Sequence, residues 1–580
     1  MEYHYTSERN IQIVIALLKS HGIKRVIASP GATDIAIVAS MQQDPYFEMY
    51  SCLDERSAAY MACGMAAECS EPVVIVCTGA TSSRNYMPGL TEAFYRKLPV
   101  LAITCCRSNV NVGHYVDQVT DRSNLPNDIA NVSVYAQSID HPDDEWDVMI
   151  KVNKAILGLK KDGGGPCHIN LATGRGGRYF DVKELPSVRV IERYTLEDTL
   201  PEMPQGKVGI FVGAHEKWSD ELTDAVNKFC AEYGATVFCD HTSNYKGIYR
   251  VLFPLIQDQF GESLKSPDID ILIHIGYVSN CVFKGKQMWR VNLDGEIRDP
   301  FRRMTKVFQM SELAFFKSYV HENASTSRTS ICEEWKTKYE TLLASIPELP
   351  FSNIWVAKQL SYRLPQNSVL HLGIRNSIRS WNYFEIPDTV LSYCNTGGFG
   401  IDGGVSSLIG ASLSNPNKLY FGAFGDLLFF YDMNSLGNRE IKSNVRILIV
   451  NNGLGQEFKN YSCVGSIFGD DTNKYIAAQG HYGNQSPILV KQYAEALGFE
   501  YLTASNKEEF KSTAERFVTP ELTENPMVFE VFTKTQDESK ALELTTLISN
   551  ESKLKRKADE LMGHPILKPV REVLKNSLKK

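Results

Sequence analysis

The sequence predicts an α/β protein made of three doubly wound parallel-sheet domains and a C-terminal helical tail. Short apolar runs typical of buried strands alternate with amphipathic helical patterns along most of the chain. A chain of 580 residues is too long for a single hydrophobic core. With 43% hydrophobic and 22% charged residues, the composition is that of an ordinary globular protein, so a disordered or fibrous class is not expected.

The first alternating block covers residues 1–185. Its expected strands read RVIASP, VVIVCT, VLAIT and HINLA, and the helical patterns between them include IQIVIALLKSHG, AAYMACGMAAE and LTEAFYRK. Strands that alternate with helices in this way are usually parallel neighbours in one sheet, because the helix carries the chain back across the sheet. We therefore predict one doubly wound domain over residues 1–185.

Two further blocks repeat this architecture. Residues 186–345 contain the expected strands VGIFVGA, ATVFCD and IDILIHIG, and SIPELPFSN at 345–353 is typical of a linker. Residues 346–540 contain SVLHLG, LYFGAF, RILIVN and MVFEVFT. We predict a central α/β domain and a third α/β domain over these ranges.

Residues 541–580 form the predicted tail, which is basic. Residues 551–580 carry nine Lys or Arg against four Asp or Glu, whereas the whole chain has a net charge of −7. We interpret the tail as a solvated helix or as an arm that packs on an acidic neighbouring subunit, with contact to RNA or a membrane as the minority alternative.

Charge, hydropathy and cysteine usage exclude several classes of protein. A net charge of −7 argues against a general binder of nucleic acid or acidic membranes. The most apolar runs are far shorter than the roughly 20 residues of a membrane-spanning helix, and the N-terminus lacks the pattern of a signal peptide. Thirteen cysteines, never spaced C-x-x-C, are typical of reduced core residues. We expect a cytoplasmic protein with no nucleic-acid or membrane partner.

Two polar residues follow neighbouring expected strands of the third block. LYFGAFG, a helix and VRILIVN form one βαβ unit, so Asp426 and Asn452, 26 positions apart, should meet at the carboxyl edge of the sheet. A carboxylate, an amide oxygen and a nearby backbone carbonyl suit Mg²⁺ that also binds ligand phosphates. Taken alone, these residues are explained more simply by a helix cap at Asp426 and a turn at Asn-Asn-Gly.

The same pair resembles the signature of thiamine diphosphate-dependent enzymes, in which Gly-Asp opens and Asn-Asn closes a segment of about this length. GDLLFFYDMN is similar to the GDLSALYDLN version, and NNGLGQEF to NNNGGQIF, in the branch of 2-succinyl-5-enolpyruvyl-6-hydroxy-3-cyclohexene-1-carboxylate (SEPHCHC) synthases of menaquinone biosynthesis. The resemblance implies that Asp426, Asn452 and the carbonyl of Leu454 hold Mg²⁺, and that Gly425 and Gly455 lie at the bound thiamine diphosphate. It makes residues 346–540 the diphosphate-binding domain.

The resemblance extends to the N-terminal block, which would be the pyrimidine-binding domain. In this family a glutamate after a strand bonds to the aminopyrimidine ring and drives the deprotonation that activates the cofactor. Glu55, between MYSCL and an Ala-rich helix, stands at that place. An acidic residue at a helix start is more often a cap, but SPG before it and CTGATSSRNYMPGLTEA after it favour catalysis. The small residues of this helix, Ala58, Ala59, Ala62, Cys63 and Ala66, predict close helix packing at a subunit interface.

Further site residues follow from the same likeness. VLAITCCR, GHYVDQVTDRS and NTGGFGIDGGVSSLIGAS are each similar to a segment of the family. The resemblance implies Gln118 as an active-site hydrogen-bonding group, Ile401 as the apolar wedge under the bent cofactor, and Arg107, Ser377, Arg379 and Phe458 as candidates for the substrate pocket.

The match fails at residues that bind substrate carboxylates. Thr33, Thr396 and Trp381 stand where the SEPHCHC synthase branch has arginines, although Arg375 and Arg379 lie close enough in sequence to substitute. Each lost arginine should cost a few kcal/mol of carboxylate binding, at roughly 1.5–3 kcal/mol per bond to a charged group. Either the donor or acceptor substrate has changed, or the same chemistry uses relocated arginines.

We predict from this resemblance an enzyme, of the transferase or lyase class, that decarboxylates a 2-oxo acid and transfers the resulting acyl unit to an acceptor. A homodimer or dimer of dimers is implied, with Glu55 of one subunit activating the cofactor of the other. The alternatives are a simple 2-oxo acid decarboxylase or acetolactate-synthase-like enzyme, and a thiamine diphosphate-binding regulatory protein without turnover. The sequence does not identify the substrates, the pathway or any ligand of the central domain.

Overall fold

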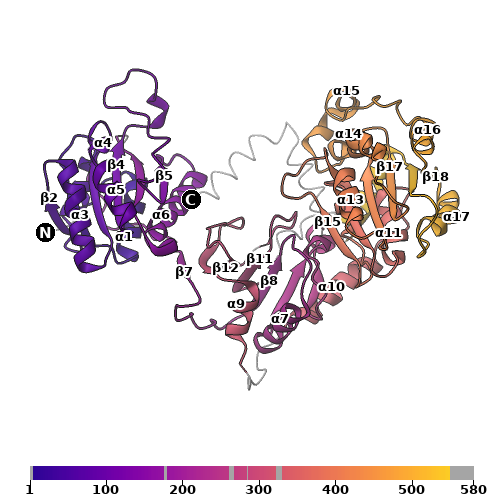
Figure 1. The fold of residues 1–580 in the computed structure, drawn as a ribbon, viewed down its shortest axis with the longest axis horizontal. Coiled ribbons are helices and arrows are strands. Elements are labelled where there is room, and N and C mark those ends of the chain that lie inside the picture. Colours follow the sequence, from indigo (N-terminus) through magenta and orange to yellow (C-terminus); the bar gives the residue numbers. More distant parts are fainter. Residues whose placement is uncertain (1–3, 175–178, 260–266, 284, 322–329, 549–580) are drawn as a thin grey trace, which may run out of the picture. The chain divides into compact units, whose positions relative to one another are not determined.

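The computed structural model describes residues 4–174, 179–259, 267–283, 285–321 and 330–548 (Figure 1). It divides into two compact units. The first unit comprises Met1–Thr199 and Asp294–Gln309, and the second comprises Leu200–Leu293 and Met310–Lys580. Residues 549–580, most of the predicted basic tail, lie outside the described residues.

The first unit contains a six-stranded, all-parallel sheet with the strand order β2-β1-β3-β4-β6-β5, which we call the first sheet. A further parallel pair in this unit joins β13 to β7. The strands are β1 (Arg25–Ala28), β2 (Glu48–Ser51), β3 (Val73–Thr78), β4 (Val100–Cys106), β5 (Val132–Ala136), β6 (Cys167–Ala172), β7 (Glu192–Tyr194) and β13 (Met304–Gln309). The helices are α1 (Arg9–Ser20), α2 (Ile35–Gln42), α3 (Glu55–Cys69), α4 (Ser82–Asn85), α5 (Met87–Tyr95) and α6 (Pro142–Gly158).

Helices cover both faces of the first sheet. Every residue of β3, β4 and β6 is buried, as expected for parallel strands between two helical layers. Val74 and Val76 of β3 pack in one core cluster, whereas Val73 and Ile75 pack in another, because successive side chains of a strand point to opposite faces. The apolar runs of the sequence therefore form the buried central strands of this sheet.

The small residues of α3 pack closely, as predicted, but they do so inside the chain. Ala58, Ala59, Ala62, Cys63 and Ala66 are all buried in the cluster that α3 forms with α5 and the first sheet. They are thus covered by their own chain and do not face a subunit interface. At the crossing of the two helices, Gly89 of α5 lies directly against Ala59.

The second unit contains two groups of parallel strands. The central strands have the order β10-β9-β8-β11-β12, and the third sheet has the order β15-β14-β16-β17-β19-β18. The central elements are β8 (Val208–Val212), α7 (Asp220–Tyr233), β9 (Thr236–Cys239), β10 (Arg250–Leu252), α8 (Pro254–Gln257), β11 (Ile271–Ile275), β12 (Gln287–Asn292), α9 (Glu312–Tyr319) and α10 (Cys332–Ala344). Those of the third sheet are α11 (Asn353–Leu360), β14 (Val369–Leu372), α12 (Asn376–Trp381), β15 (Leu391–Cys394), α13 (Gly404–Leu413), β16 (Tyr420–Gly425), α14 (Asp426–Asp432), β17 (Val445–Asn451), α15 (Thr472–Tyr475), α16 (Leu489–Ala496), β18 (Glu500–Ala504), α17 (Lys507–Phe517), β19 (Met527–Phe532) and α18 (Thr535–Thr546).

These parallel sheets confirm the predicted fold class. Within the second unit, the loops after the central strands pack on the third sheet through buried polar contacts. The backbone N–H of His241 donates to Asn382 Oδ1 at 3.0 Å, and that of Ser392 donates to Asn244 Oδ1 at 2.8 Å. These bonds hold the segment that follows β9 against the end of α12 and against β15. The domain boundaries at residues 185, 345 and 540 stay predictions.

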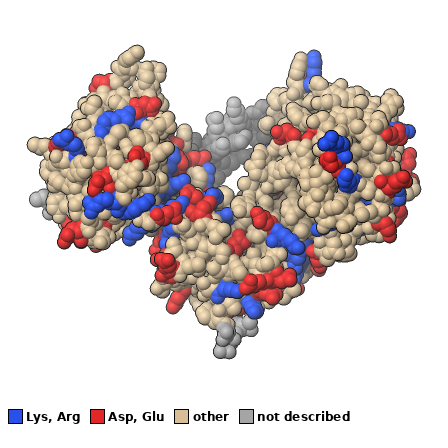
Figure 2. Space-filling view, viewed as in Figure 1, with Lys and Arg blue, Asp and Glu red and all other residues tan. Residues whose placement is uncertain are grey.

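The thirteen cysteines are free thiols, and nine of them are buried, which agrees with their predicted place in the core. Among the described residues, no helix has both the length and the hydropathy needed to cross a membrane. On the face shown in Figure 2, Lys and Arg side chains are interspersed with Asp and Glu side chains over the described surface. Such a mixed surface is usual for a globular protein.

We expect Gly89→Ala to lower the midpoint of urea unfolding. A β-carbon at residue 89 would lie 2.4 Å from the β-carbon of Ala59, so α3 and α5 would have to separate. Overpacking of this kind costs about 1–3 kcal/mol. Gly410→Ala in α13 is the control, because a β-carbon there meets nothing within 4 Å and should be neutral or stabilising. An unchanged midpoint for Gly89→Ala would contradict the close packing.

Candidate functional site

Two neighbouring strands bring the predicted metal ligands together. Asp426 begins α14 directly after β16, and Asn452 directly follows β17. β16 and β17 pair in parallel, so both residues lie at the carboxyl edge of the third sheet. The backbone N–H of Gly453 donates to Asp426 Oδ2 at 2.8 Å, which closes the Asn-Asn-Gly turn onto the carboxylate. The backbone carbonyl of Leu454 accepts one bond, from the N–H of Gln456 at 3.0 Å, and has a second lone pair.

Asp426 interacts electrostatically with two other buried acids of the second unit, Glu530 and Glu538. Asp426 is 4% exposed, Glu530 of β19 is 0% exposed and Glu538 of α18 is 6% exposed. Burial raises the pKa of Asp426 and of Glu538 to about 7, and also raises the pKa of Glu530. Within the ranges that the structure describes, none of the three forms an ion pair with Lys, Arg or His. A bound cation would therefore stabilise their ionised forms.

The donor set at Asp426 is suited to a hard cation that shares its ligands. It consists of a carboxylate, the Asn452 amide oxygen and the Leu454 carbonyl, which are oxygen ligands of the kind that Mg²⁺ prefers. Over the described residues, no group of three or more His, Cys, Asp or Glu side chains is arranged to hold a metal by itself. A metal bound here would need further oxygen ligands from phosphate and water, as Mg²⁺ usually does.

The loops beside this turn carry the predicted wedge and one substrate candidate. Ile401 lies in the loop between β15 and α13 and is half-buried on the core cluster of the third sheet. Gly455 donates its N–H to the carbonyl of Ala477 at 2.6 Å, and a β-carbon there would lie 3.0 Å from the ring of Phe458. Phe458 itself is 41% exposed. A glycine at 455 thus lets the exposed ring lie close to the turn.

A salt bridge ties α12 to the segment after Asn452. Arg379 donates through Nη1 and Nη2 to the two carboxylate oxygens of Glu457 at 2.8 and 2.9 Å, and through Nη1 to Asn376 Oδ1 at 2.9 Å. Burial opposes the charge of Glu457, but the hydrogen bonds from Arg379 lower its pKa below the usual value. Ser377 is buried beside this pair, in the same helix. Arg379 therefore already has a carboxylate partner inside the protein.

Glu55 is the first residue of α3 and is not the residue that caps it. Asp54 is the cap, because its Oδ1 accepts two backbone N–H groups of the first helical turn at 2.9 and 3.4 Å. Glu55 Oε2 instead accepts a hydrogen bond from Asn85 Nδ2 of α4 at 3.0 Å. Burial opposes the charge of Glu55, but hydrogen bonds from Asn85 and Ser82 lower its pKa below the usual value. The carboxylate is thus held ionised and has acceptor capacity left.

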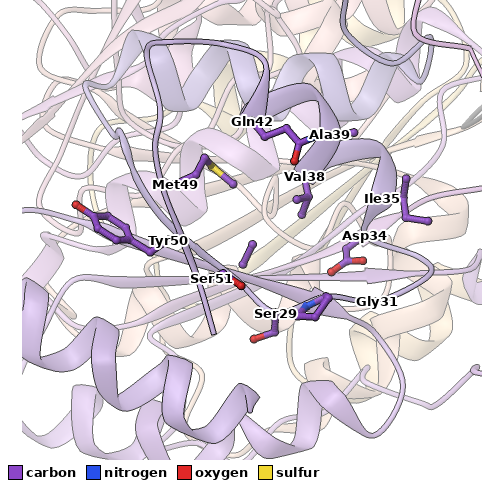
Figure 3. Close-up of a pocket in the computed structure, with 12 residues that line it drawn as sticks. Ser29, Gly31, Asp34, Ile35, Val38, Ala39, Gln42, Met49, Tyr50 and Ser51 are labelled. Carbon is purple, nitrogen blue, oxygen red and sulfur yellow. The ribbon is translucent and has the colours of Figure 1, made fainter. Parts of the chain in front are cut away.

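A cavity of about 410 Å³ lies beside the turn that follows β1. In Figure 3, Asp34 points toward Gly31 of this turn, while side chains of α2 and β2 line the other sides. Asp34 is buried, and its Oδ2 has no hydrogen-bond partner in the described structure. Burial raises the pKa of Asp34 to about 6, and the negative charge of Glu55 acts in the same direction. This cavity therefore contains a carboxyl group that changes charge near neutral pH.

A second cavity of the first unit, of about 640 Å³, brings Arg107 and Gln118 together. Arg107 donates to both carboxylate oxygens of Asp117 at 3.0 and 2.9 Å. Gln118 is exposed and has a φ of 58°, which is uncommon for a residue other than glycine. Thr33 lines the same cavity, but its hydroxyl donates to the backbone carbonyl of Cys105 at 2.6 Å.

The residues that stand where the related branch has arginines are poorly placed to bind an acid. The Thr33 hydroxyl is engaged by backbone, as described above. Thr396 is 4% exposed, and Trp381 is 2% exposed with no hydrogen-bond partner for its Nε1 in the described residues. None of the three presents a cation, so the lost arginines are not replaced at their own positions.

The structure groups the predicted site residues into two sets. The first unit holds Glu55, Arg107 and Gln118, and the other set lies in the second unit. Sequence reasoning missed several residues that contact the predicted site residues or change the charge around them. It missed them because each interacts with residues that are distant in the chain. The missed residues are Asp34, Asn85, Glu457, Glu530 and Glu538.

The chain is similar to proteins of known family over almost its whole length. Residues 10–125 match the model of the thiamine pyrophosphate enzyme, N-terminal TPP binding domain. The 2-succinyl-5-enolpyruvyl-6-hydroxy-3-cyclohexene-1-carboxylate synthase of Bacteroides thetaiotaomicron is 28% identical over 576 residues, which cover 93% of this chain and 98% of the relative. The synthase of Bacteroides fragilis is 29% identical with the same coverage. The one of Flavobacterium psychrophilum is 26% identical over 90% of this chain and 96% of the relative. The similarity thus extends across both units.

We expect Arg379 and Glu457 to be energetically coupled. Removing either side chain leaves the other charge partly buried without its partner, since the two are 24% and 25% exposed. A double-mutant cycle of Arg379→Ala and Glu457→Ala should give a coupling free energy of about 1–3 kcal/mol in urea unfolding. The surface pair Lys540 and Glu543 is the control and should give less than about 0.5 kcal/mol. Additive effects at Arg379 and Glu457 would show that the salt bridge does not stabilise this fold.

Proposed function

Since this chain belongs to the thiamine pyrophosphate enzyme family, we propose that it decarboxylates a 2-oxo acid with thiamine diphosphate and Mg²⁺ and joins the remaining acyl unit to an acceptor. The observation that carries the proposal is the division of roles at the start of α3. Asp54 caps the helix, which leaves the ionised carboxylate of Glu55 available to a ligand. A residue present only for helix stability would not need this second carboxylate.

Glu55 would accept a hydrogen bond from a ring nitrogen of the cofactor and promote loss of the proton that activates it. Asn85 supports this role, because its bond to Glu55 Oε2 fixes the carboxylate and keeps it charged. When bound, thiamine diphosphate supplies the electron sink for the electron pair that remains when CO₂ leaves. The protein's task is then to orient the cofactor and to move protons at its edge.

Asp426, Asn452 and the Leu454 carbonyl would hold Mg²⁺, and the metal would bind the diphosphate. The burial of three acids, Asp426, Glu530 and Glu538, without an ion-pair partner among the described residues supports a cation at this place. Gly425 and Gly455 would lie at the cofactor, and Ile401 would pack against it. The substrate candidates remain Arg107, Gln118, Ser377, Arg379 and Phe458.

We propose that the complete site forms between subunits of a homo-oligomer, with Glu55 of one subunit acting on the cofactor held by Asp426 of another. The family relationship supports this arrangement. A dimer and a dimer of dimers would both provide it.

A changed substrate is favoured over the reaction named for the relatives. Thr33, Thr396 and Trp381 present no cation, and Arg107 and Arg379 are each paired with a carboxylate of the protein. A simple decarboxylase is the second candidate. An acidic acceptor would also need a cation to bind it, and the same positions lack one. Product analysis with and without acceptors separates the two.

We expect the purified protein with thiamine diphosphate and Mg²⁺ to release CO₂ from at least one of 2-oxoglutarate, pyruvate and phosphonopyruvate. Glu55→Gln should lower this rate by about 10²–10⁴-fold, because an amide cannot accept the proton. Glu68→Gln, exposed on the same helix, is the control and should retain the rate. Bound cofactor without CO₂ release from any acid, with or without isochorismate as acceptor, would replace the enzyme proposal by a regulatory binding protein.

We expect thiamine diphosphate with Mg²⁺ to raise the thermal midpoint of the protein, and EDTA to abolish this rise. At a ligand concentration of about 100 times Kd, binding to the folded state adds about 2.7 kcal/mol. Asp426→Asn should remove most of this stabilisation, because the metal loses its charged ligand. Asp470→Asn, almost fully exposed in the same unit, is the control. Equal shifts for both variants would exclude Asp426 as a metal ligand.

A further inference from the structure

Arg375 has an unusual backbone conformation at the edge of the third sheet. It lies three residues after the end of β14 and has φ 68° and ψ −111°. Positive φ is unfavourable for residues other than glycine and persists only where the surrounding structure imposes it. Here the N–H groups of Ile378 and Arg379 bond to the carbonyls of Gly373 and Arg375 at 2.9 and 3.0 Å. These bonds hold the turn that presents Arg375.

The guanidinium of Arg375 forms no hydrogen bond or ion pair with an acid among the described residues, although its charge helps to lower the pKa of Glu457. Its side chain lies on Phe399, whose ring centre is 4.8 Å from the Arg375 Cζ. Phe399 also has a positive φ, of 58°, and lies two residues before Ile401. Arg375 is exposed, whereas Arg379 next to it is bound to Glu457. Arg375 is thus an exposed cation without a direct ion pair, held over an aromatic ring beside the loop proposed to support the cofactor.

A polar cavity of about 170 Å³ in the second unit lies against Arg375. Asn280, Arg379 and Asn382 also line it, together with two acids. Asp240 Oδ2 accepts from the Ser279 hydroxyl at 2.8 Å, and Asp258 Oδ2 accepts from the Tyr383 hydroxyl at 2.7 Å. Burial raises the pKa of both acids, so they oppose a bound anion less than two free carboxylates would.

The reaction chemistry indicates which acidic group a free arginine should bind. The carboxylate lost as CO₂ must give up its negative charge, so a cation bound to it would stabilise the substrate more than the transition state. An acidic group that the substrate retains keeps its charge throughout. A planar guanidinium suits such a carboxylate because it can donate two parallel hydrogen bonds.

We infer that Arg375 is a specificity-determining residue that binds a carboxylate retained by the substrate, in the cavity that it lines. The inference rests on the proposed function, since it takes the substrate to be the 2-oxo acid that is decarboxylated. It places the selection for an acidic substrate at Arg375, while Arg107 and Arg379 each remain paired with a carboxylate of the protein.

The test compares an acid with and without the retained carboxylate. For the full-length holoenzyme, kcat/KM for CO₂ release is measured with 2-oxoglutarate and with 2-oxopentanoate, which have the same chain length. Arg375→Gln should lower the ratio of the two values by about 10- to 100-fold. Arg375→Lys, which keeps the charge without the fork, should lie between wild type and Arg375→Gln. Arg439→Gln, at a fully exposed arginine of the same unit, should leave the ratio unchanged. An unchanged ratio in Arg375→Gln would overturn the inference.

Binding separates a failure of this inference from a failure of the proposed function. Calorimetry of the cofactor-loaded protein with glutarate and with pentanoate needs no turnover. Tighter binding of glutarate than pentanoate in wild type, lost in Arg375→Gln, supports the inference even if no 2-oxo acid reacts. Equal binding of the two acids by wild type, or equal glutarate binding by wild type and Arg375→Gln, would overturn it.

Discussion

The parallel pairing of β16 with β17 is the constraint on which the candidate site depends. It brings two residues 26 positions apart to one edge of the third sheet, where the N–H of Gly453 reaches the carboxylate of Asp426. The same pairing buries that carboxylate and raises its pKa. A negative charge in this place is costly unless a cation or further hydrogen bonds accompany it. Bound Mg²⁺ would therefore stabilise the ionised form of Asp426, and a diphosphate could bind to the metal.

Charge compensation distinguishes the residues around the site more clearly than residue type does. Arg107 and Arg379 have carboxylate partners within the protein, so binding a substrate acid there would compete with an existing ion pair. In the described structure Arg375 forms no ion pair or hydrogen bond with an acid, although its charge acts on Glu457, and Asp426 forms no ion pair with a cation. Unpaired charges at the carboxyl edge of a parallel sheet are the natural places for ligands of opposite charge. Asp426 would bind a metal ion, and Arg375 would bind an acid.

The resemblance to the SEPHCHC synthases rests on the residues proposed to bind the cofactor and fails at those proposed to bind the substrate. Glu55 and Asp426 lie in local settings that suit their proposed roles. The residues at the arginine positions are instead buried or bonded to backbone. Cofactor chemistry can stay constant while substrate binding changes, because different side chains carry the two tasks. An identity below 30% over nearly the whole chain agrees with such a division.

The sequence by itself determined the parallel α/β class, the meeting of Asp426 with the Asn-Asn-Gly turn, and the place of Glu55 at a helix start. These features follow from local periodicity and from the right-handed βαβ crossover, which are properties of short segments. Only the tertiary structure showed that Asp54 caps α3, that Asn85 holds Glu55, and that Glu457 occupies Arg379. It also showed that the small face of α3 is covered by α5 of its own chain. Such contacts join residues up to 78 positions apart, and the path of the loops between them decides which side chains meet. The spacing of residues along a strand or helix does not predict the path of these loops.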